Sequence, residues 1–364
     1  MKVINFSKRQ QIVSKINFTF DEKIKTNFYT TDYFLKAKNV LNNKNKNEVT
    51  TMQFICFNST PFMMCGGYEI KALLEFYLTQ EQLNRTELYL LEEGTIVDDQ
   101  QTPLVIIKGY YLDFMCLENI IDGILTRRCS VATNCMQAIQ TLLPHQNIIY
   151  MADRNCDYFN QSYDAYPAYL AGIDLFVTAA QIDFIKSDHN TKVIGTVPHS
   201  LIQQYRNNLG LMISDFSEVN KTKEIMCLID YENYALKTLD QLLPSFNLLA
   251  GIRLDTSSNL VDQSLKNKNL FGVNFELINL VKEWLINHKL ENKKIVVTSK
   301  VTPQKIHEIN MHTDVVDYYG VGSFFLTTSV HVSADLVEIN NQHEAKFGRK
   351  LLANAHLLHK VEWN

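Results

Sequence analysis

The segment GTVPHS, residues 195–200, places His199 just beyond a short apolar run at residues 193–194. An imidazole at the end of a strand can act as a general base, as a nucleophile or as a structural hydrogen-bonding group. The next residue, Ser200, adds a hydroxyl at the start of an expected helix, residues 200–205. The segment alone leaves all three roles open.

A second segment, GIRLDTSS, places two opposite charges, Arg253 and Asp255, two residues apart. In a strand, residues at this spacing face the same side. The pair could be only an ion pair. A ribose ring, however, presents paired hydroxyls that a carboxylate can bind at two points, and an arginine matches carboxylate or phosphate groups. Binding of a sugar phosphate is therefore the functional alternative.

A third segment, YYGVGS, supplies Gly320, Gly322 and Ser323 before the apolar residues 324–326. Backbone N–H groups at the start of a helix can form a cradle for a phosphate. A tight turn explains the two glycines equally well.

Each of these segments follows a short apolar run, and such runs recur at the spacing of strand–helix units. They lie at residues 148–151, 193–194, 225–229, 248–252, 295–297 and 315–316. Short apolar runs bounded by turn residues are typical of buried parallel strands. Ligands bind at the carboxyl ends of such strands. We therefore expect one active-site face, to which Arg154, Asp174, Thr298 and Ser299 also contribute.

The elements that carry this face fall into two parts. Before residue 121, strand-like runs at residues 52–57, 87–91 and 104–108 alternate with helical segments, which indicates a small α+β domain. Residues 121–327 carry the strand–helix alternation. A further strand at residues 333–340 is expected to return to the first domain. The predicted domains are therefore residues 1–120 with 328–364, and residues 121–327.

The composition excludes several classes of function. The chain has 364 residues, 46% of them hydrophobic, and a formal net charge of −4, so we expect a folded protein without a nucleic-acid partner. No stretch resembles a signal peptide or a membrane span, and we expect no membrane partner. The seven cysteines are scattered and never spaced as CxxC, which favours reduced thiols in a cytoplasmic protein.

Taken together, the segments resemble the nicotinate phosphoribosyltransferases, a family of type II phosphoribosyltransferases, and most closely its shorter forms. GTVPHS and GIRLDTSS, in this order and separation, are the specific matches. Supporting matches are Tyr33-Phe34, Glu92-Glu93-Gly94-Thr95, Leu117-Glu118, Ser130-Val131-Ala132-Thr133, Ala168-Tyr169 with Gly172 and Asp174, YYGVGS, and residues 334–338. The resemblance implies an α/β protein, with an incomplete α/β barrel and an α+β N-terminal domain, that forms a homodimer with a shared active site.

The resemblance also implies a reaction. The family joins nicotinate to 5-phosphoribosyl-1-pyrophosphate, which gives nicotinate mononucleotide and pyrophosphate, with Mg²⁺ and with hydrolysis of ATP as a co-substrate. By position, His199 is the residue that ATP phosphorylates, and a neutral imidazole is a good nucleophile toward phosphorus near neutral pH. Asp255 would hold the ribose hydroxyls or the metal, and Arg253 the phosphoribosyl or pyridine end.

The remaining candidate residues would complete the substrate site. The turn at Gly320, Gly322 and Ser323 would bind the 5-phosphate together with Thr298 and Ser299. Arg154 would meet a phosphate or the nicotinate carboxylate, and Tyr33 of the partner subunit would stack on the pyridine ring. Thr133, Asp174 and Ser200 are further substrate-binding candidates.

Four departures from the family pattern bear on the site. Asn155 follows Arg154 where the family usually has a second arginine, and the loop after Thr298 lacks the glycines or acidic residue that are common there. Lys300 could supply the missing charge. A common Asp-Thr-Tyr reads Asp230-Tyr231-Glu232, and Asn134 stands where a lysine often follows the Ala-Thr pair. The sequence leaves two alternatives open: a phosphoribosyltransferase for another pyridine, nicotinamide or quinolinate, and a non-catalytic nucleotide-binding relative.

Overall fold

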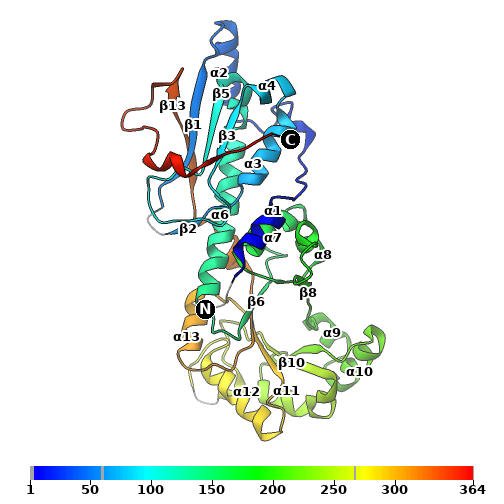
Figure 1. Ribbon diagram of the computed structural model, residues 1–364. Helices are drawn as coiled ribbons and strands as arrows, with labels where there is room; N and C mark the ends of the chain where they lie inside the picture. The colour runs from blue at the N-terminus through cyan, green and yellow to red at the C-terminus, as the bar shows by residue number, and fades with distance from the viewer. Residues whose placement is uncertain (1–3, 59–60, 266–267, 364) are drawn as a thin grey trace.

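The computed structural model describes residues 4–58, 61–265 and 268–363. Two sheets with their helices lie one above the other in Figure 1, and the long helix α6 (Glu118–Gln140) runs from the upper part into the lower. The upper sheet is antiparallel and the lower one is parallel. The predicted fold class, an incomplete α/β barrel with an α+β N-terminal domain, is confirmed.

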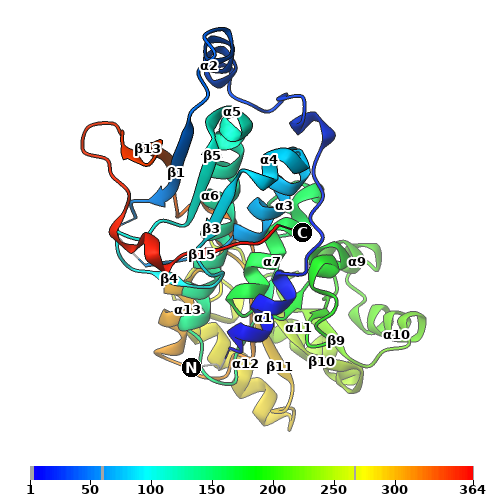
Figure 2. The same cartoon turned by 45° about the horizontal axis from the view of Figure 1, so that its top comes forward.

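The upper sheet has the strand order β14-β13-β1-β5-β3-β15. The bounds are β1 (Val49–Cys56), β3 (Glu87–Leu90), β5 (Val105–Tyr110), β13 (Val332–Ile339), β14 (Gln342–His343) and β15 (His359–Lys360). Strand β13 pairs with β1 from Thr50↔Ile339 to Cys56↔Val332, and β15 pairs with β3, which Figure 2 shows as the red end of the chain beside β3. Both ends of the chain therefore build this sheet.

The upper part also contains the small sheet of β2 (Phe62–Met63) and β4 (Ile96–Val97), and the helices α2 (Asp32–Asn43), α3 (Gly67–Tyr77), α4 (Gln80–Asn84) and α5 (Tyr111–Phe114). Helix α1 (Phe6–Val13) packs against the lower part, whose core includes Val13 (Figure 1). The helical stretch between β2 and β3 is divided into the two helices α3 and α4. Thr79 forms a capping box with Gln82, which starts α4 as a separate helix. No helix in the described part of the chain is long and apolar enough to cross a membrane.

The Glu-Gly-Thr segment, residues 93–95, supplies a buried carboxylate, that of Glu93, to the start of helix α3. Glu93 accepts hydrogen bonds from the backbone N–H groups of Gly66, at 3.0 Å, and Tyr68, at 3.2 Å, at the start of α3. An acidic group is favourable at a helix N-terminus. Burial nevertheless raises the pKa of Glu93 to about 7, against the opposing effect of these hydrogen bonds.

Stability should therefore fall as the pH rises from about 4.5 to about 7. In this window the folded state keeps the Glu93 proton that the unfolded state has released, so the free energy of unfolding decreases with pH, and the whole penalty is present above about 7. In Glu93→Gln this slope should flatten, by roughly 2–3 kcal/mol between pH 4.5 and 8. Melting temperatures across pH measure the slope. The exposed neighbour Glu92→Gln is the control, and parallel curves for wild type and Glu93→Gln would contradict the assignment.

The lower sheet is parallel, in the order β8-β7-β6-β12-β11-β10-β9. Its strands are β6 (Asn147–Tyr150), β7 (Leu175–Phe176), β8 (Lys192–Val193), β9 (Ile225–Leu228), β10 (Leu249–Leu254), β11 (Lys294–Val297) and β12 (Tyr318–Val321). The last begins two residues beyond the apolar run expected at residues 315–316, and its first residue, Tyr318, is in register with Asn147 of β6. The edge strands β8 and β9 do not pair. One backbone hydrogen bond, Val197 N–H to Met226 O at 3.1 Å, connects the chain after β8 to β9.

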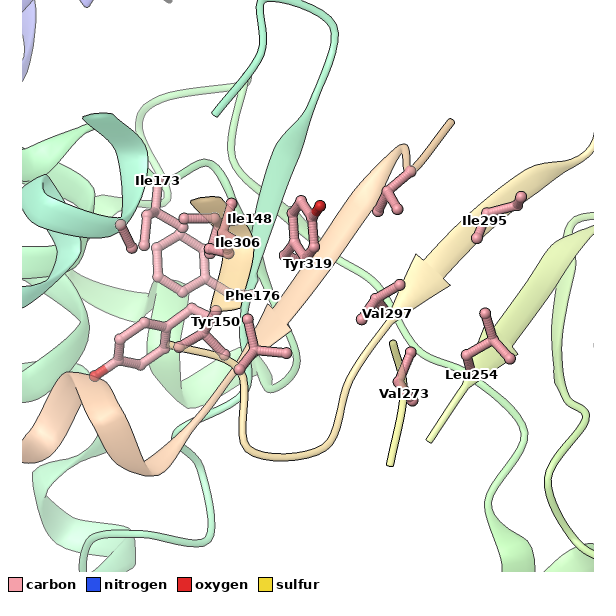
Figure 3. Packing of buried hydrophobic residues seen from close by; sticks show 14 of the residues in the cluster. Ile148, Tyr150, Ile173, Phe176, Leu254, Val273, Ile295, Val297, Ile306 and Tyr319 are labelled. Atoms are coloured by element: carbon pink, nitrogen blue, oxygen red, sulfur yellow. The ribbon is translucent and has the colours of Figure 1, made fainter. Parts of the chain in front are cut away.

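The helices of this part are α7 (Gln161–Ala171), α8 (Ala179–Ile182), α9 (His199–Gln204), α10 (Leu209–Asn220), α11 (Ala235–Leu242), α12 (Phe275–Asn287) and α13 (Pro303–Asn310). Alternate strand residues such as Ile148, Tyr150 and Tyr319 are buried and pack with helix residues such as Ile306, as Figure 3 shows. Each fully buried large apolar side chain contributes about 1.5–3 kcal/mol. With one face of the sheet covered in this way, the other residues of each strand face the interior of the half-barrel.

Buried charges join the two parts. Arg128 on α6 donates to Glu69 on α3 at 2.7 and 3.0 Å, and Tyr166 on α7 donates to the same carboxylate at 2.9 Å. Arg127 forms a two-point ion pair with Asp164 on α7. Because breaking a buried ion pair is costly, this network holds α3, α6 and α7 in one arrangement.

Candidate active site

The carboxyl ends of neighbouring parallel strands bring polar side chains to one rim. Leu254 of β10 is in register with Val297 of β11, so the residues that follow them, Asp255 and Thr298, lie side by side. The Thr298 hydroxyl donates to Asp255 Oδ1 at 2.6 Å. The strand-end prediction therefore holds for this pair.

Arg253 is fixed by three partners at this rim. Its Nε donates to Thr298 Oγ1 at 2.9 Å, its Nη2 to Asp255 Oδ2 at 2.9 Å and its Nη1 to Thr196 Oγ1 at 2.8 Å. The guanidinium carries more donors than these contacts use. It is therefore a rigid cationic fork with donors left for an anionic ligand.

His199 lies at the same rim and pairs with a carboxylate that was not among our candidates. Its Nε2 is 3.3 Å from Asp230 Oδ2 and 3.4 Å from Oδ1. The hydrogen bond to Asp230 raises the pKa of His199, although burial acts in the opposite direction. With Nε2–H held by the carboxylate, Nδ1 carries the lone pair. Asp230 directly follows the apolar run at residues 225–229, so the strand-end argument applied to the strand next to β10 could have found it.

His199, Asp230 and Asp255 form a candidate metal centre. One ligand atom from each lies within 4.8 Å of the others. Mg²⁺ prefers oxygen ligands, so the two carboxylates fit this ion, whereas an imidazole is a ligand for softer metals. Asp230 and Asp255 are thus the residues that could hold Mg²⁺.

An open cavity of about 730 Å³ occupies the inner face of the half-barrel beside this cluster. Its walls are mixed: Ile149, Leu175 and Val296 are apolar, Arg253 and Arg154 are cationic groups near the carboxyl ends of strands, and Lys192 and Lys294 lie at the opposite ends of theirs. A cavity of this size can hold a small organic molecule, and its charged lining suits a polar one.

The glycines of YYGVGS are required by close packing. A Cβ on Gly320 would lie 2.6 Å from Met151 Sδ, and one on Gly322 would lie 2.7 Å from Met151 O. Ser323 begins a short 3-10 turn, η7 (Ser323–Leu326). The turn lies at the rim, and its role as a phosphate cradle stays a prediction.

Three other candidates lie away from this rim. Asp174 precedes β7, at the opposite end of the sheet, and pairs with Arg9 at 2.5 Å, because the apolar run before it ends helix α7 and is not a strand. Thr133 is buried in α6, where its hydroxyl donates to Cys129 O at 2.6 Å and accepts from Met63 N–H at 3.0 Å. Tyr33 is 61% exposed on α2, at the top of Figure 1, so the site of its own chain does not include it.

The remaining candidates are exposed or form the loop after β11. Arg154 is exposed, lines the cavity and has no ion-pair partner among the described residues, and Ser200 is exposed in the first turn of α9. Ser299 and Lys300 have positive φ values of 74° and 49°, a backbone that glycine adopts most easily. Lys305, which the sequence did not suggest, donates to Ser299 O at 3.0 Å.

No protein-family model and no curated protein sequence matches the chain. Solved structures do match. The nicotinate-nucleotide pyrophosphorylase from Pyrococcus furiosus is 23% identical with a TM-score of 0.74, over 95% of this chain and 86% of that one. Human nicotinic acid phosphoribosyltransferase is 13% identical with a TM-score of 0.64, over 88% and 77%. The nicotinate-nucleotide pyrophosphorylase from Ehrlichia chaffeensis is 12% identical with a TM-score of 0.57, over 92% and 100%. At these identities the likeness shows the fold: the chain has the architecture that these pyridine-nucleotide enzymes share.

Proposed function

We propose that the protein is a nicotinate phosphoribosyltransferase, which joins nicotinate to 5-phosphoribosyl-1-pyrophosphate and couples the reaction to ATP hydrolysis through His199. The observation that carries the proposal is the convergence of the His199–Asp230 pair with Arg253, Asp255 and Thr298 at one rim. The fold of solved nicotinate and nicotinate-nucleotide enzymes supports it.

The transfer step requires charge stabilisation more than covalent help. The pyridine nitrogen attacks C1 of the ribose as the bond from C1 to the pyrophosphate oxygen breaks, and positive charge develops on the sugar. The Asp255 carboxylate would hold the ribose hydroxyls, and the free donors of Arg253 would bind an anionic group of the substrates. A magnesium ion at Asp230 and Asp255 would neutralise phosphate charge.

The ATP step uses the histidine. Nδ1 of His199 attacks the γ-phosphorus, the bond to the bridging oxygen breaks and ADP leaves. Asp230 accepts Nε2–H and stabilises the positive charge that forms on the ring. Water later hydrolyses the phosphohistidine, which restores the imidazole and releases phosphate.

A second candidate function is transfer to quinolinate. The sequence left this pyridine open, and structural neighbours of this chain include nicotinate-nucleotide pyrophosphorylases as well as a nicotinic acid phosphoribosyltransferase. Quinolinate has a second carboxylate, and the exposed Arg154 at the cavity is a cation that could meet it. The ATP-linked role of His199 has no place in that reaction.

A product assay with nicotinate, nicotinamide and quinolinate, each with and without ATP, tests the proposal. We expect nicotinate mononucleotide from nicotinate, at a yield that ATP increases. Carbon dioxide release from quinolinate without ATP dependence would favour the second candidate. Nucleotide binding in calorimetry without any product would identify a non-catalytic relative.

Mixing Tyr33→Ala and His199→Ala chains should restore ATP-stimulated mononucleotide formation if the active site is shared between subunits. In a dimer of Tyr33→Ala and His199→Ala chains, the site on the first chain keeps His199 and receives Tyr33 of the partner subunit. Half of the dimers would have one such site, so about a quarter of wild-type activity is expected. Steady-state rates after joint refolding measure it. A mixture no more active than either variant would contradict a shared site.

A further inference from the structure

The chain after β11 forms a turn, and the side chain of one lysine, Lys305, forms a hydrogen bond with it. Ser299 and Lys300 both adopt left-handed backbone, and α13 begins at Pro303. Lys305, in the first turn of α13, extends back toward β11, and its Nζ donates to Ser299 O at 3.0 Å. Its ammonium group therefore lies beneath the turn that directly follows Thr298, at the rim.

The Lys305 ammonium is poorly compensated. Among the described residues no carboxylate forms an ion pair with it, and its one hydrogen-bond acceptor is a neutral carbonyl. Burial lowers the pKa of Lys305, and the charges that oppose this effect are those of Glu308 and Asp255. A cation removed from water without a charged partner costs free energy, and a bound anion would offset this cost. By contrast, Lys294 at the other end of β11 pairs with Asp317 at 2.7 Å.

The surroundings of Lys305 suit a terminal phosphate. Thr298 supplies a hydroxyl beside the turn, and the adjacent β12 comes so close that a Cβ on Gly320 would lie 2.6 Å from Thr298 Cγ2. The turns after β11 and β12 are therefore neighbours. Hydroxyls, backbone N–H groups and one ammonium are the donors that phosphate sites use.

We propose that Lys305 binds the 5-phosphate of the phosphoribosyl substrate, between the turn at Thr298 and Ser299 and the turn at Gly322 and Ser323. This inference rests on the proposed function. It assigns to Lys305 the cationic role for which the sequence suggested Lys300. Lys300 is exposed and forms no side-chain hydrogen bond with the described residues.

Binding measurements on purified full-length protein test the proposal without turnover. Calorimetry would compare ribose 5-phosphate, inorganic pyrophosphate and nicotinate on wild type, Lys305→Met, Lys305→Gln and Lys305→Arg, with Lys300→Met as the matched control. Lys305→Met and Lys305→Gln should weaken ribose 5-phosphate binding at least tenfold and change the affinities for the other two ligands less than about threefold. Lys305→Arg should retain most of the affinity, and Lys300→Met should behave as wild type.

Lys305→Gln tests the positive charge separately from the hydrogen bond to the turn, because the glutamine amide can still donate to Ser299 O. Wild-type affinity of this variant for ribose 5-phosphate would overturn the proposal and leave Lys305 as an anchor of the turn. Equal weakening of all three ligands, or weakening of pyrophosphate alone, would also overturn it. Failure of the proposed function is a different outcome, in which wild type binds none of the three ligands and forms no product.

Discussion

Replacing His199 with alanine should abolish transfer of phosphate from ATP to the protein and remove the stimulation of mononucleotide formation by ATP. The imidazole is the proposed attacking group, and the Asp230 carboxylate, 3.3 Å from it, is proposed only to orient the ring and to stabilise its charge. We expect ATP hydrolysis to fall by about three orders of magnitude or more, as for other covalent nucleophiles. Radioactivity from γ-labelled ATP retained on the protein as an acid-labile adduct measures the step directly.

Two variants sharpen this result. His189→Ala removes an exposed histidine and should retain full labelling. Asp230→Asn keeps the shape of the pair and removes its charge, so labelling should be slower than in wild type and faster than in His199→Ala. Full labelling of His199→Ala would show that ATP phosphorylates another residue.

Replacing Asp255 with asparagine should lower kcat/KM for mononucleotide formation by about a thousandfold. Asp255 accepts from Arg253 at 2.9 Å and from Thr298 at 2.6 Å, and it is one of the two carboxylates suited to Mg²⁺. The change should therefore disturb the position of the guanidinium and weaken both the proposed ribose contact and the proposed binding of Mg²⁺. Initial rates at varied Mg²⁺ and varied 5-phosphoribosyl-1-pyrophosphate measure these effects.

The exposed pair of Asp183 and Lys186 offers a control for this substitution. Asp183→Asn removes a carboxylate whose ion pair is on the surface, so it should leave the rates unchanged. If Asp255→Asn retained kcat/KM within threefold of wild type, neither the ribose nor the metal would depend on this carboxylate.

The sequence predicted those site residues that lie at the carboxyl end of a strand. Arg253, Asp255 and Thr298 lie in or directly after neighbouring strands, and the register of those strands gathers them. His199 follows the edge strand β8, so its place at the rim also depends on the chain after β8 reaching β9 through the Val197 N–H to Met226 O hydrogen bond. Asp230 satisfies the same rule, but the sequence marked it only as part of a departure from the family pattern and not as a site residue. The domain junction, in contrast, depends on Arg128 and Glu69, whose contact spans 59 residues of chain.

Contacts between distant segments explain what the sequence could not predict. Asp174 follows an apolar run, as Asp230 does, but that run is a helix, and Arg9 from the first helix of the chain holds the carboxylate at the other end of the sheet. Lys305 lies in an ordinary amphipathic helix pattern, and only the turn at Ser299 shows that its amine points back to the rim. Helix and strand interpretations of short apolar runs are ambiguous without such contacts.

A structure of the protein with 5-phosphoribosyl-1-pyrophosphate and Mg²⁺ would be the most direct test of the account. We expect the sugar at the rim of the half-barrel, with its hydroxyls within hydrogen-bonding distance of Asp255 and with the His199 ring facing the same space. A ligand bound elsewhere, with the Arg253–Asp255 pair unchanged and His199 turned away from it, would contradict the account.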